Sequence, residues 1–280
     1  MGRSVSSGRT DLGYFLPNPE VVPMAPFDLD AYHEQRRSTD VGATVRYREQ
    51  SGSTMDDARA GAEADEPCGS AYVAGKQSAG RGRQGRQWVS PLGAGLHVTY
   101  HLCPPKSDRT PLLSVAGALA AADAIRETSG LRSDLKWPND VLYEGKKLCG
   151  VLAEARHGER LDVFLGIGIN VRVASDMPDE VRAIATSIEQ AGGAVPSLEA
   201  LLAALSAALQ GWTWRTATDP DGMVAEWRSR LVTLGQRVTL AAPAGEVTGE
   251  AVDVTDHGEL VLRLDSGLTQ SFSAGDVTTV

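Results

Sequence analysis

The spacing of apolar and polar residues predicts that helices and strands alternate through the middle of the chain. Apolar residues recur every three to four positions over Leu112–Ile125, a run that ends at Gly130. The same period returns over Leu198–Leu209, with an end expected near Trp212 and Trp214, and a further helix is expected over Met223–Leu231.

Shorter runs predict strands and one capped helix. The helix begins at Met55, because Ser53 or Thr54 can cap it and two aspartates lie in its first turn. Strands are expected at Ser70–Lys76, Gly95–Leu102, Val141–Tyr143, Lys147–Arg156 and Arg160–Gly168. The short linkers between the last three predict hairpin turns.

From Gly235 the pattern changes to apolar residues that alternate with polar ones, interrupted by glycines. This predicts a small antiparallel β-barrel of about 45 residues. Residues 1–40 lack sustained periodicity and are rich in glycine, serine, proline and charge, which predicts a flexible arm. The expected fold class is α/β (α+β), with an arm over 1–40, a mixed-sheet domain over 41–232 and a barrel over 233–280.

Composition narrows the class of protein. With 280 residues, 42% of them hydrophobic, the chain can form one sizeable core and a small second domain. No apolar run approaches the roughly 20 residues that span a bilayer, and no secretory signal pattern opens the chain, so we expect a cytoplasmic protein without membrane contact. Cys68, Cys103 and Cys149 show no CxxC spacing, which predicts reduced thiols with neither a disulfide nor a metal site.

The candidate chemistry begins at Gly80–Trp88 (GRGRQGRQW), where three arginines and three glycines fall within seven residues. Glycine permits tight bends, and arginine can form paired hydrogen bonds to phosphate or carboxylate. The segment therefore predicts a loop that closes over an anion. Arginine–glycine tracts also bind nucleic acid, as a non-catalytic protein would, but the net charge of −9 would repel a polyanion.

Four motifs follow one another along the chain: GRGRQGRQW at 80–88, KWPND at 136–140, GKKLCGVLAE at 145–154 and GIGIN at 166–170. As a set they resemble the biotin protein ligases, from about Tyr47 to the C-terminus. The resemblance implies a biotin/lipoate-ligase-like catalytic domain followed by an SH3-like barrel. Forty irregular residues do not hold the N-terminal DNA-binding domain of some members, so we expect a monofunctional ligase that does not bind DNA.

The resemblance implies a two-step reaction that uses biotin, ATP and Mg²⁺. The carboxylate of biotin attacks the α-phosphate of ATP, and a lysine of a carrier protein then attacks the biotinyl-5'-AMP. A carboxylate that meets a triphosphate needs fixed positive charge, and the reactive adenylate needs a loop that closes over it. The implied partner is the biotin carboxyl carrier domain of a carboxylase, and we expect the protein itself to be a monomer or weak homodimer.

By resemblance, the expected catalytic residues are Lys147, Arg83 and Asp140. Biotin binding is assigned to Ser53, Thr54, Met55, Gln77, Arg81, Gly82, Arg83, Lys147, Gly150 and Gly168. ATP binding is assigned to Arg83, Arg86, Trp88, Lys136, Asn139, Asp140 and Asn170, with Asn139 and Asp140 as candidate Mg²⁺ ligands. Met55 stands where the family commonly has asparagine, and Gln84 where it often has a basic residue, which leaves affinity open.

Several of these residues also fit simpler structural roles. Lys147 also fits an exposed hairpin tip, Asn139 and Asp140 also fit a turn, and Trp88 also fits a buried anchor for the loop. A lipoate or octanoate ligase, which shares the fold and an acyl-lysine product, is the nearest alternative enzyme.

Overall fold

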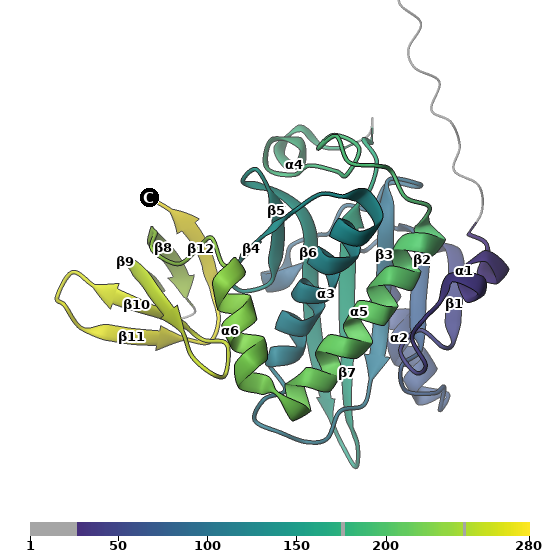
Figure 1. The fold of residues 1–280 in the computed structure, drawn as a ribbon, viewed down its shortest axis with the longest axis horizontal. Coiled ribbons are helices and arrows are strands. Elements are labelled where there is room, and N and C mark those ends of the chain that lie inside the picture. Colours follow the sequence, from purple (N-terminus) through teal and green to yellow (C-terminus); the bar gives the residue numbers. More distant parts are fainter. Residues whose placement is uncertain (1–26, 175–176, 243–244) are drawn as a thin grey trace, which may run out of the picture.

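The computed structural model describes residues 27–174, 177–242 and 245–280, and its main feature is a mixed sheet of seven strands (Figure 1). The strands are β1 (Val45–Ser51), β2 (Ala71–Gln77), β3 (Gly95–Leu102), β4 (Asp134–Lys136), β5 (Asp140–Tyr143), β6 (Lys146–His157) and β7 (Leu161–Asn170). Their order is β1-β2-β3-β7-β6-β5-β4, with β1 and β2 parallel and the other neighbours antiparallel. All eight residues of β3 are buried, because helices cover both faces of this central strand.

Helices pack on both faces of the sheet. On one face, α3 (Leu112–Ser129) and α5 (Leu198–Thr218) pack against each other and lie in front of the strands in Figure 1. On the other face, α2 (Thr54–Glu63) covers β2, β3 and β7, with Met55 in its own apolar cluster. The remaining helices are α1 (Leu29–Gln35), the 3-10 turn η1 (Arg83–Gly85), α4 (Asp179–Ile184) and α6 (Pro220–Arg230). None of the helices in the described ranges is both long and apolar enough to cross a membrane.

Local chemistry sets the ends of these helices. The hydroxyl of Ser53 caps α2 by accepting from the Met55 N–H, and Gly130 ends α3 in the left-handed region at φ 78°, both as predicted. The predicted end of the next helix near Trp212 and Trp214 is too early, since α5 continues to Thr218. It ends there because Pro220 begins α6 and disfavours helical geometry at the residue before it.

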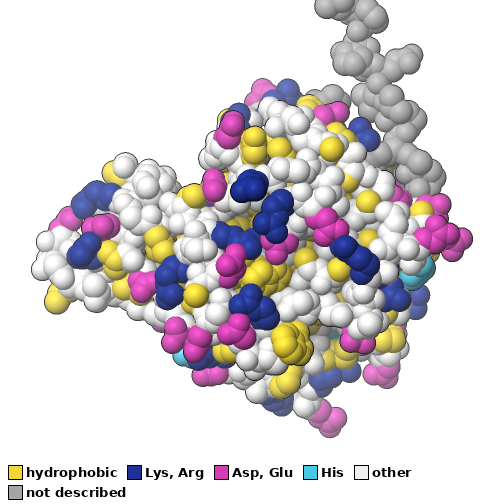
Figure 2. All heavy atoms as spheres, in the orientation of Figure 1, with side chains coloured by type: hydrophobic (Ala, Val, Ile, Leu, Met, Phe, Trp, Pro, Cys, Tyr) yellow, Lys and Arg dark blue, Asp and Glu magenta, His cyan; other side chains and the backbone are white. Residues whose placement is uncertain are grey.

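For the small antiparallel β-barrel predicted after Gly235, the antiparallel strands are confirmed as a separate sheet, and its closure into a barrel stays a prediction. It contains β8 (Arg237–Ala242), β9 (Gly245–Val254), β10 (Leu260–Leu264), β11 (Thr269–Phe272) and β12 (Asp276–Thr279), in the order β11-β10-β9-β8-β12. Figure 2 shows it as a narrower lobe beside the main body. Trp137 joins the two parts: its ring N–H donates to the Gly258 carbonyl and its backbone N–H to the Thr233 hydroxyl, both at 3.0 Å.

The prediction of an irregular arm over 1–40 is wrong for the part that the structure describes; residues 1–26 lie outside the described residues. Asp28 caps α1 by accepting from two backbone N–H groups, and α1 packs against α5. Tyr32 is fully buried and donates its hydroxyl to the Gly42 carbonyl at 2.8 Å. A helix of seven residues is too short to give a periodic signal, and this tertiary contact stabilises it.

The prediction of three reduced cysteines is also wrong. Cys68 and Cys103 form a disulfide with Cα atoms 5.7 Å apart, whereas Cys149 is free and buried. The two bonded cysteines lie 35 residues apart in sequence. Antiparallel pairing brings the start of β2 beside the end of β3, with Ala71 opposite Tyr100, and this tertiary contact leaves no mark in the cysteine spacing.

Candidate active site

A cavity of about 350 Å³ lies between the arginine–glycine loop (residues 80–88), strands β6 and β7, and the start of β12. A volume of this size suits a small organic ligand. Its lining includes every residue to which the sequence assigned a role: Ser53, Thr54, Met55, Gln77, Arg81, Gly82, Arg83, Arg86, Trp88, Lys136, Asn139, Asp140, Lys147, Gly150, Gly168 and Asn170. The fold therefore brings four separate motifs around one space, while the role of each residue stays a prediction.

One wall of the cavity carries a chain of side-chain hydrogen bonds. The Gln77 amide oxygen accepts from the Thr54 N–H at 2.9 Å and from the Thr54 hydroxyl at 3.2 Å. The Gln77 amide nitrogen donates to Ser90 at 3.0 Å, and the hydroxyls of Thr54 and Thr99 lie 2.8 Å apart. Closely placed donors and acceptors of this kind can fix the orientation of a small polar ring.

Met55 lines the cavity from the first turn of α2. It is 3% exposed, and a Cβ added at Gly166 would lie 3.2 Å from its sulfur atom. A thioether is at best a weak hydrogen-bond acceptor, so Met55 adds apolar surface beside the hydroxyl groups of Ser53 and Thr54.

The floor of the cavity is built from two glycines that pair across β6 and β7. Gly150 lies directly opposite Gly168 in the register, so neither strand presents a side chain there. The indole of Trp88 lies on this floor: a Cβ added at Gly168 would be 2.5 Å from its Cε2 atom, and one at Gly150 would be 2.9 Å from its Cζ3 atom. The floor therefore accepts a flat group at close range.

Lys147 points into the cavity. Its Nζ atom lies 2.6 Å from Asp140 Oδ1 and 5.7 Å from the centroid of the Trp88 ring. The neighbouring Lys146 is exposed, as alternation along β6 requires. Lys147 therefore has a carboxylate partner inside the cavity. A lysine at a freely solvated hairpin tip would not have such a partner.

Two arginines of the loop pair with protein carboxylates. Arg81 makes a two-point contact with Asp56, which lowers the pKa of that carboxyl. Arg86 forms an ion pair with Asp276 at the start of β12, in the C-terminal sheet. Each carboxylate occupies a guanidinium that can also bind an anionic ligand.

Arg83 is the most enclosed arginine of the loop. It donates to the side-chain oxygen of Asn139 at 3.3 Å. Burial lowers the pKa of its guanidinium, and the nearby charges of Asp276 and Asp140 act in the opposite direction. A guanidinium taken partly out of water gains more from an anionic ligand than an exposed one does.

The KWPND motif forms the turn between β4 and β5, with a cis peptide bond between Trp137 and Pro138. Asn139 is buried, and its amide nitrogen donates to the Val151 carbonyl. Of the two candidate Mg²⁺ ligands, Asp140 thus carries the more accessible oxygen atoms. One carboxylate fits a Mg²⁺ ion that takes its other ligands from phosphates and water.

Asn170, at the end of β7, has its side-chain nitrogen directed at backbone carbonyls. It donates to the carbonyl of Thr186 at 3.0 Å and to that of Lys147 at 3.4 Å. The side chain therefore holds the segment after α4 against β6, at the edge of the cavity.

Several lining residues were missed by the sequence analysis. Thr99 and His97 lie on β3, and burial lowers the pKa of His97 to about 4, so its imidazole is neutral at neutral pH. Strand alternation over Gly95–Leu102 could have placed both on one face. The contribution of Asp276–Thr278 from β12 depends on how the two parts of the chain meet, which no local signal reports.

Comparisons with known proteins agree with this arrangement. Residues 53–170 match the Biotin/lipoate A/B protein ligase family, and residues 233–278 match the Biotin protein ligase C terminal domain. The chain is 38% identical over 238 residues to the "Biotin--[acetyl-CoA-carboxylase] ligase" of Mycobacterium tuberculosis, covering 81% of this chain and 86% of that protein. It is 33% identical over 242 residues to the "Bifunctional ligase/repressor BirA" of Bacillus subtilis, covering 84% and 74%.

A solved structure shares the fold over most of the chain. The biotin protein ligase from Aquifex aeolicus in complex with biotin and ATP superposes with a TM-score of 0.73 at 26% identity. The match covers 84% of this chain and 98% of the other.

Proposed function

The chain belongs to the biotin protein ligase family, and we propose which of its residues carry out that family's two half-reactions. Its activity is that of an ATP-dependent ligase that makes biotinyl-5'-AMP and transfers the biotinyl group to a carboxylase carrier protein. The observation that supports the residue assignments is the convergence of all four motifs on one cavity.

For the first half-reaction, we assign the polar wall and the glycine floor to biotin. Ser53, Thr54 and Gln77 would contact the ureido ring, and the ring system would lie over Gly150 and Gly168. An oxygen of the biotin carboxylate attacks the α-phosphorus of ATP, the bond to the leaving oxygen breaks, and pyrophosphate departs. This step needs positively charged groups beside the carboxylate, beside the α-phosphate and beside the leaving pyrophosphate.

The cations of the cavity are assigned to these positions. Arg81 and Arg83 would contact the biotin carboxylate and the adenylate phosphate, and Arg86 would meet the departing phosphates together with Lys136. Lys147 would neutralise charge where carboxylate and α-phosphate meet; it lines the cavity, with its Nζ atom 2.6 Å from Asp140. The carboxylate that now pairs with Arg81 would give way to the ligand anion, whereas Asp276 would keep its contact with Arg86 and hold this arginine beside the departing phosphates.

Mg²⁺ would be held by Asp140, with Asn139 beside it and the remaining ligands from ATP and water. The ion supplies neutralisation of the triphosphate charge. The buried position of Asn139, which already donates to a backbone carbonyl, makes Asp140 the main protein ligand in this proposal.

For the second half-reaction, the ε-amine of the carrier lysine attacks the acyl carbon of biotinyl-5'-AMP. The acyl–phosphate bond breaks, AMP leaves, and the amine loses a proton that Asp140 can accept. Until the carrier arrives, Arg83 and Trp88 would keep the arginine–glycine loop closed over the adenylate and exclude water.

We further propose residues 41–232 as the catalytic domain and 233–280 as a second domain that completes the cavity through β12. The partner would be the biotin carboxyl carrier domain of a carboxylase, and the protein would act in the cytoplasm as a monomer or weak homodimer. We also propose that the protein does not bind DNA. Two observations support this: the net charge is −9, and basic and acidic side chains are interspersed on the face shown in Figure 2.

Biotin-dependent adenylate formation tests the proposal. Purified protein is incubated with Mg²⁺, ATP labelled at the α-phosphate, and biotin, lipoate or octanoate in parallel, and enzyme-bound adenylate and pyrophosphate are measured. We expect adenylate with biotin alone. Adenylate with lipoate or octanoate but not with biotin would move the protein to the alternative substrate class, and a salt-sensitive shift of short DNA or RNA would reopen the binding-protein interpretation.

A further inference from the structure

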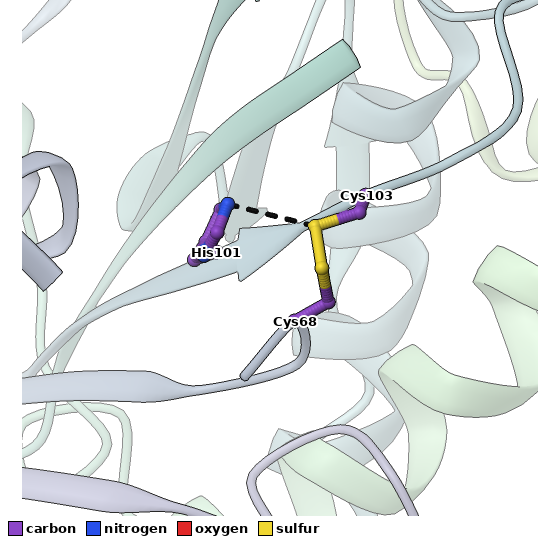
Figure 3. A group of neighbouring side chains, drawn as sticks. All are labelled: Cys68, His101 and Cys103. Carbon is purple, nitrogen blue, oxygen red and sulfur yellow. Dashed lines mark hydrogen bonds between the residues drawn. A yellow bond between two sulfur atoms is a disulfide. The ribbon is translucent and has the colours of Figure 1, made fainter. Parts of the chain in front are cut away.

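A second cluster of reactive side chains lies on the sheet outside the active-site cavity. Cys68, His101 and Cys103 converge there, with their sulfur and ring-nitrogen atoms all within 4.8 Å of one another (Figure 3). None of the three lines the cavity described above. Two sulfur ligands and an imidazole are a donor set typical of Zn²⁺.

The backbone holds these side chains together. Cys103 and His101 belong to β3 and its exit, and Cys68 belongs to the turn before β2, so the antiparallel pairing of β2 and β3 fixes their distance. The Cα atoms of the two cysteines are 5.7 Å apart, so both side chains can reach a common point. Cys68 is exposed and Cys103 half-buried, which gives small reagents access, whereas His101 is fully buried and its ring is fixed.

The distance between the imidazole and the nearer sulfur agrees with a metal site. His101 Nε2 lies 3.5 Å from Cys103 Sγ, and Figure 3 shows this nitrogen directed at the sulfur. A tetrahedral Zn²⁺ ion with bonds of about 2.3 Å to sulfur and about 2.0 Å to nitrogen holds two such atoms about 3.5 Å apart. The spacing of Nε2 and Sγ therefore fits a shared ion, once Nε2 gives up its contact with Asp162.

Charged groups surround this cluster in a second layer. Asp162 Oδ1 lies 2.9 Å from His101 Nε2 and 4.0 Å from Cys103 Sγ, and it also accepts from Arg160 at 2.7 Å. Arg156 binds the other oxygen of Asp162 at 2.9 Å. When Nε2 binds a metal, it gives up its contact with Asp162, which keeps its two arginine partners. The ring proton then moves to Nδ1, a buried atom without a hydrogen-bond partner among the described residues.

We propose that, with both thiols reduced, Cys68, His101 and Cys103 bind one Zn²⁺ ion, and that the Cys68–Cys103 disulfide is the alternative, metal-free form of the same site. A dithiol reductant supplies two electrons and two protons to the disulfide, yields two thiols and becomes a disulfide itself. Binding of Zn²⁺ then releases the two thiol protons, and the fourth position of the ion is left to water.

Co²⁺ provides the test, because a thiolate ligand gives it a charge-transfer absorption that oxygen and nitrogen ligands do not. The full chain, reduced with a phosphine that is then removed, is titrated anaerobically with Co²⁺ and back-titrated with Zn²⁺. We expect one equivalent of Co²⁺ with thiolate absorption, displaced by one equivalent of Zn²⁺. The disulfide form should show no such absorption.

Two variants keep the test specific. Cys68→Ser changes an exposed side chain, so the fold is retained. It should reduce the thiolate absorption per bound Co²⁺ to about half, because Cys103 remains, and weaken Zn²⁺ binding at least tenfold. His157→Gln, which removes an exposed imidazole elsewhere, should bind like the parent. A reduced, folded parent without thiolate absorption, or a Cys68→Ser variant that binds as tightly as the parent, would overturn the proposal.

Discussion

Arg86, on the arginine–glycine loop, forms an ion pair with Asp276, at the start of β12 in the C-terminal sheet. The two residues lie 190 positions apart, and both line the cavity. The ion pair thus links the arginine–glycine loop with the C-terminal sheet. Since the side chains of Arg86 and Asp276 are partly exposed, at 60% and 33%, the pair contributes at most about 1 kcal/mol to stability. We therefore expect it to act mainly by positioning the arginine–glycine loop.

Asp276→Ala should therefore raise the KM for ATP several-fold with little change in melting temperature. Without Asp276 the loop loses its anchor on β12, and Arg86 must be ordered by the nucleotide alone. The matched control is Asp265→Ala, which breaks the exposed pair with Arg237 in the same sheet, away from the cavity. Equal kinetic effects of the two substitutions would show that the link between Arg86 and Asp276 has no positioning role.

Lys147→Ala should slow adenylate formation by more than tenfold, which corresponds to about 1.4 kcal/mol in the barrier. The reason is loss of the cation at the point where carboxylate and α-phosphate meet. Lys146→Ala is the control, because it removes an equal charge from the adjacent, exposed position of β6. Single-turnover formation of labelled adenylate measures both, and parent-like rates for Lys147→Ala would move the catalytic assignment to another residue.

Arg83→Gly should still form adenylate but retain it poorly, because the loop loses its most enclosed arginine. The readout is biotinylation of bystander lysines on an added non-carrier protein, which should increase. Gln84→Gly is the control: Gln84 is exposed and sits at φ 55°, a conformation that glycine adopts readily. If the two variants label bystanders equally, Arg83 has no retaining function.

Gly168→Ala should weaken biotin binding at least tenfold. The new methyl group would lie 2.5 Å from the Trp88 ring and would raise the floor on which a flat ligand rests. Gly211→Ala, on α5, adds a methyl group to open space and should leave affinity unchanged. Calorimetric titration with biotin distinguishes these outcomes, and unaltered affinity in Gly168→Ala would place the ligand elsewhere in the cavity.

His97 should make the folded state sensitive to acid between about pH 6.5 and pH 4. Burial lowers its pKa to about 4, so over this range the unfolded chain binds more protons than the folded one. Stability is therefore full above about pH 6.5 and falls as the pH falls, by about 3 kcal/mol at most. Denaturant unfolding of the parent and of His97→Gln at several pH values measures the slope, which should be smaller in the variant; identical slopes would contradict the assignment.

Much of the catalytic domain could be predicted from periodicity and caps. The strand at Gly95–Leu102 and the end of α3 at Gly130 follow from local patterns, and the structure has them where the sequence placed them. The candidate site could be predicted because its residues occur in recognisable motifs, each at a turn or strand end. The motifs do not contain the strand register. It is this register that pairs Gly150 with Gly168 and makes the two glycines one floor of the cavity.

The features that the sequence analysis did not predict depend on contacts between distant segments. The helix α1 is stabilised by Tyr32 in the core, and the disulfide of Cys68 and Cys103 by the pairing of β2 with β3. Asp276 enters the site only because two domains meet there. None of these contacts changes the local spacing of residues, which is the quantity that sequence patterns report.

The most direct measurement of the central claim is transfer of biotin to a carrier lysine. Equimolar protein and an apo biotin carrier domain are incubated with biotin, ATP and Mg²⁺, and the intact mass of the carrier is followed for the parent and for Lys147→Ala. The account predicts one biotinyl group per carrier, on one lysine, formed only with ATP and much more slowly by the variant. A carrier that stays unmodified while the folded parent binds both biotin and ATP would contradict it.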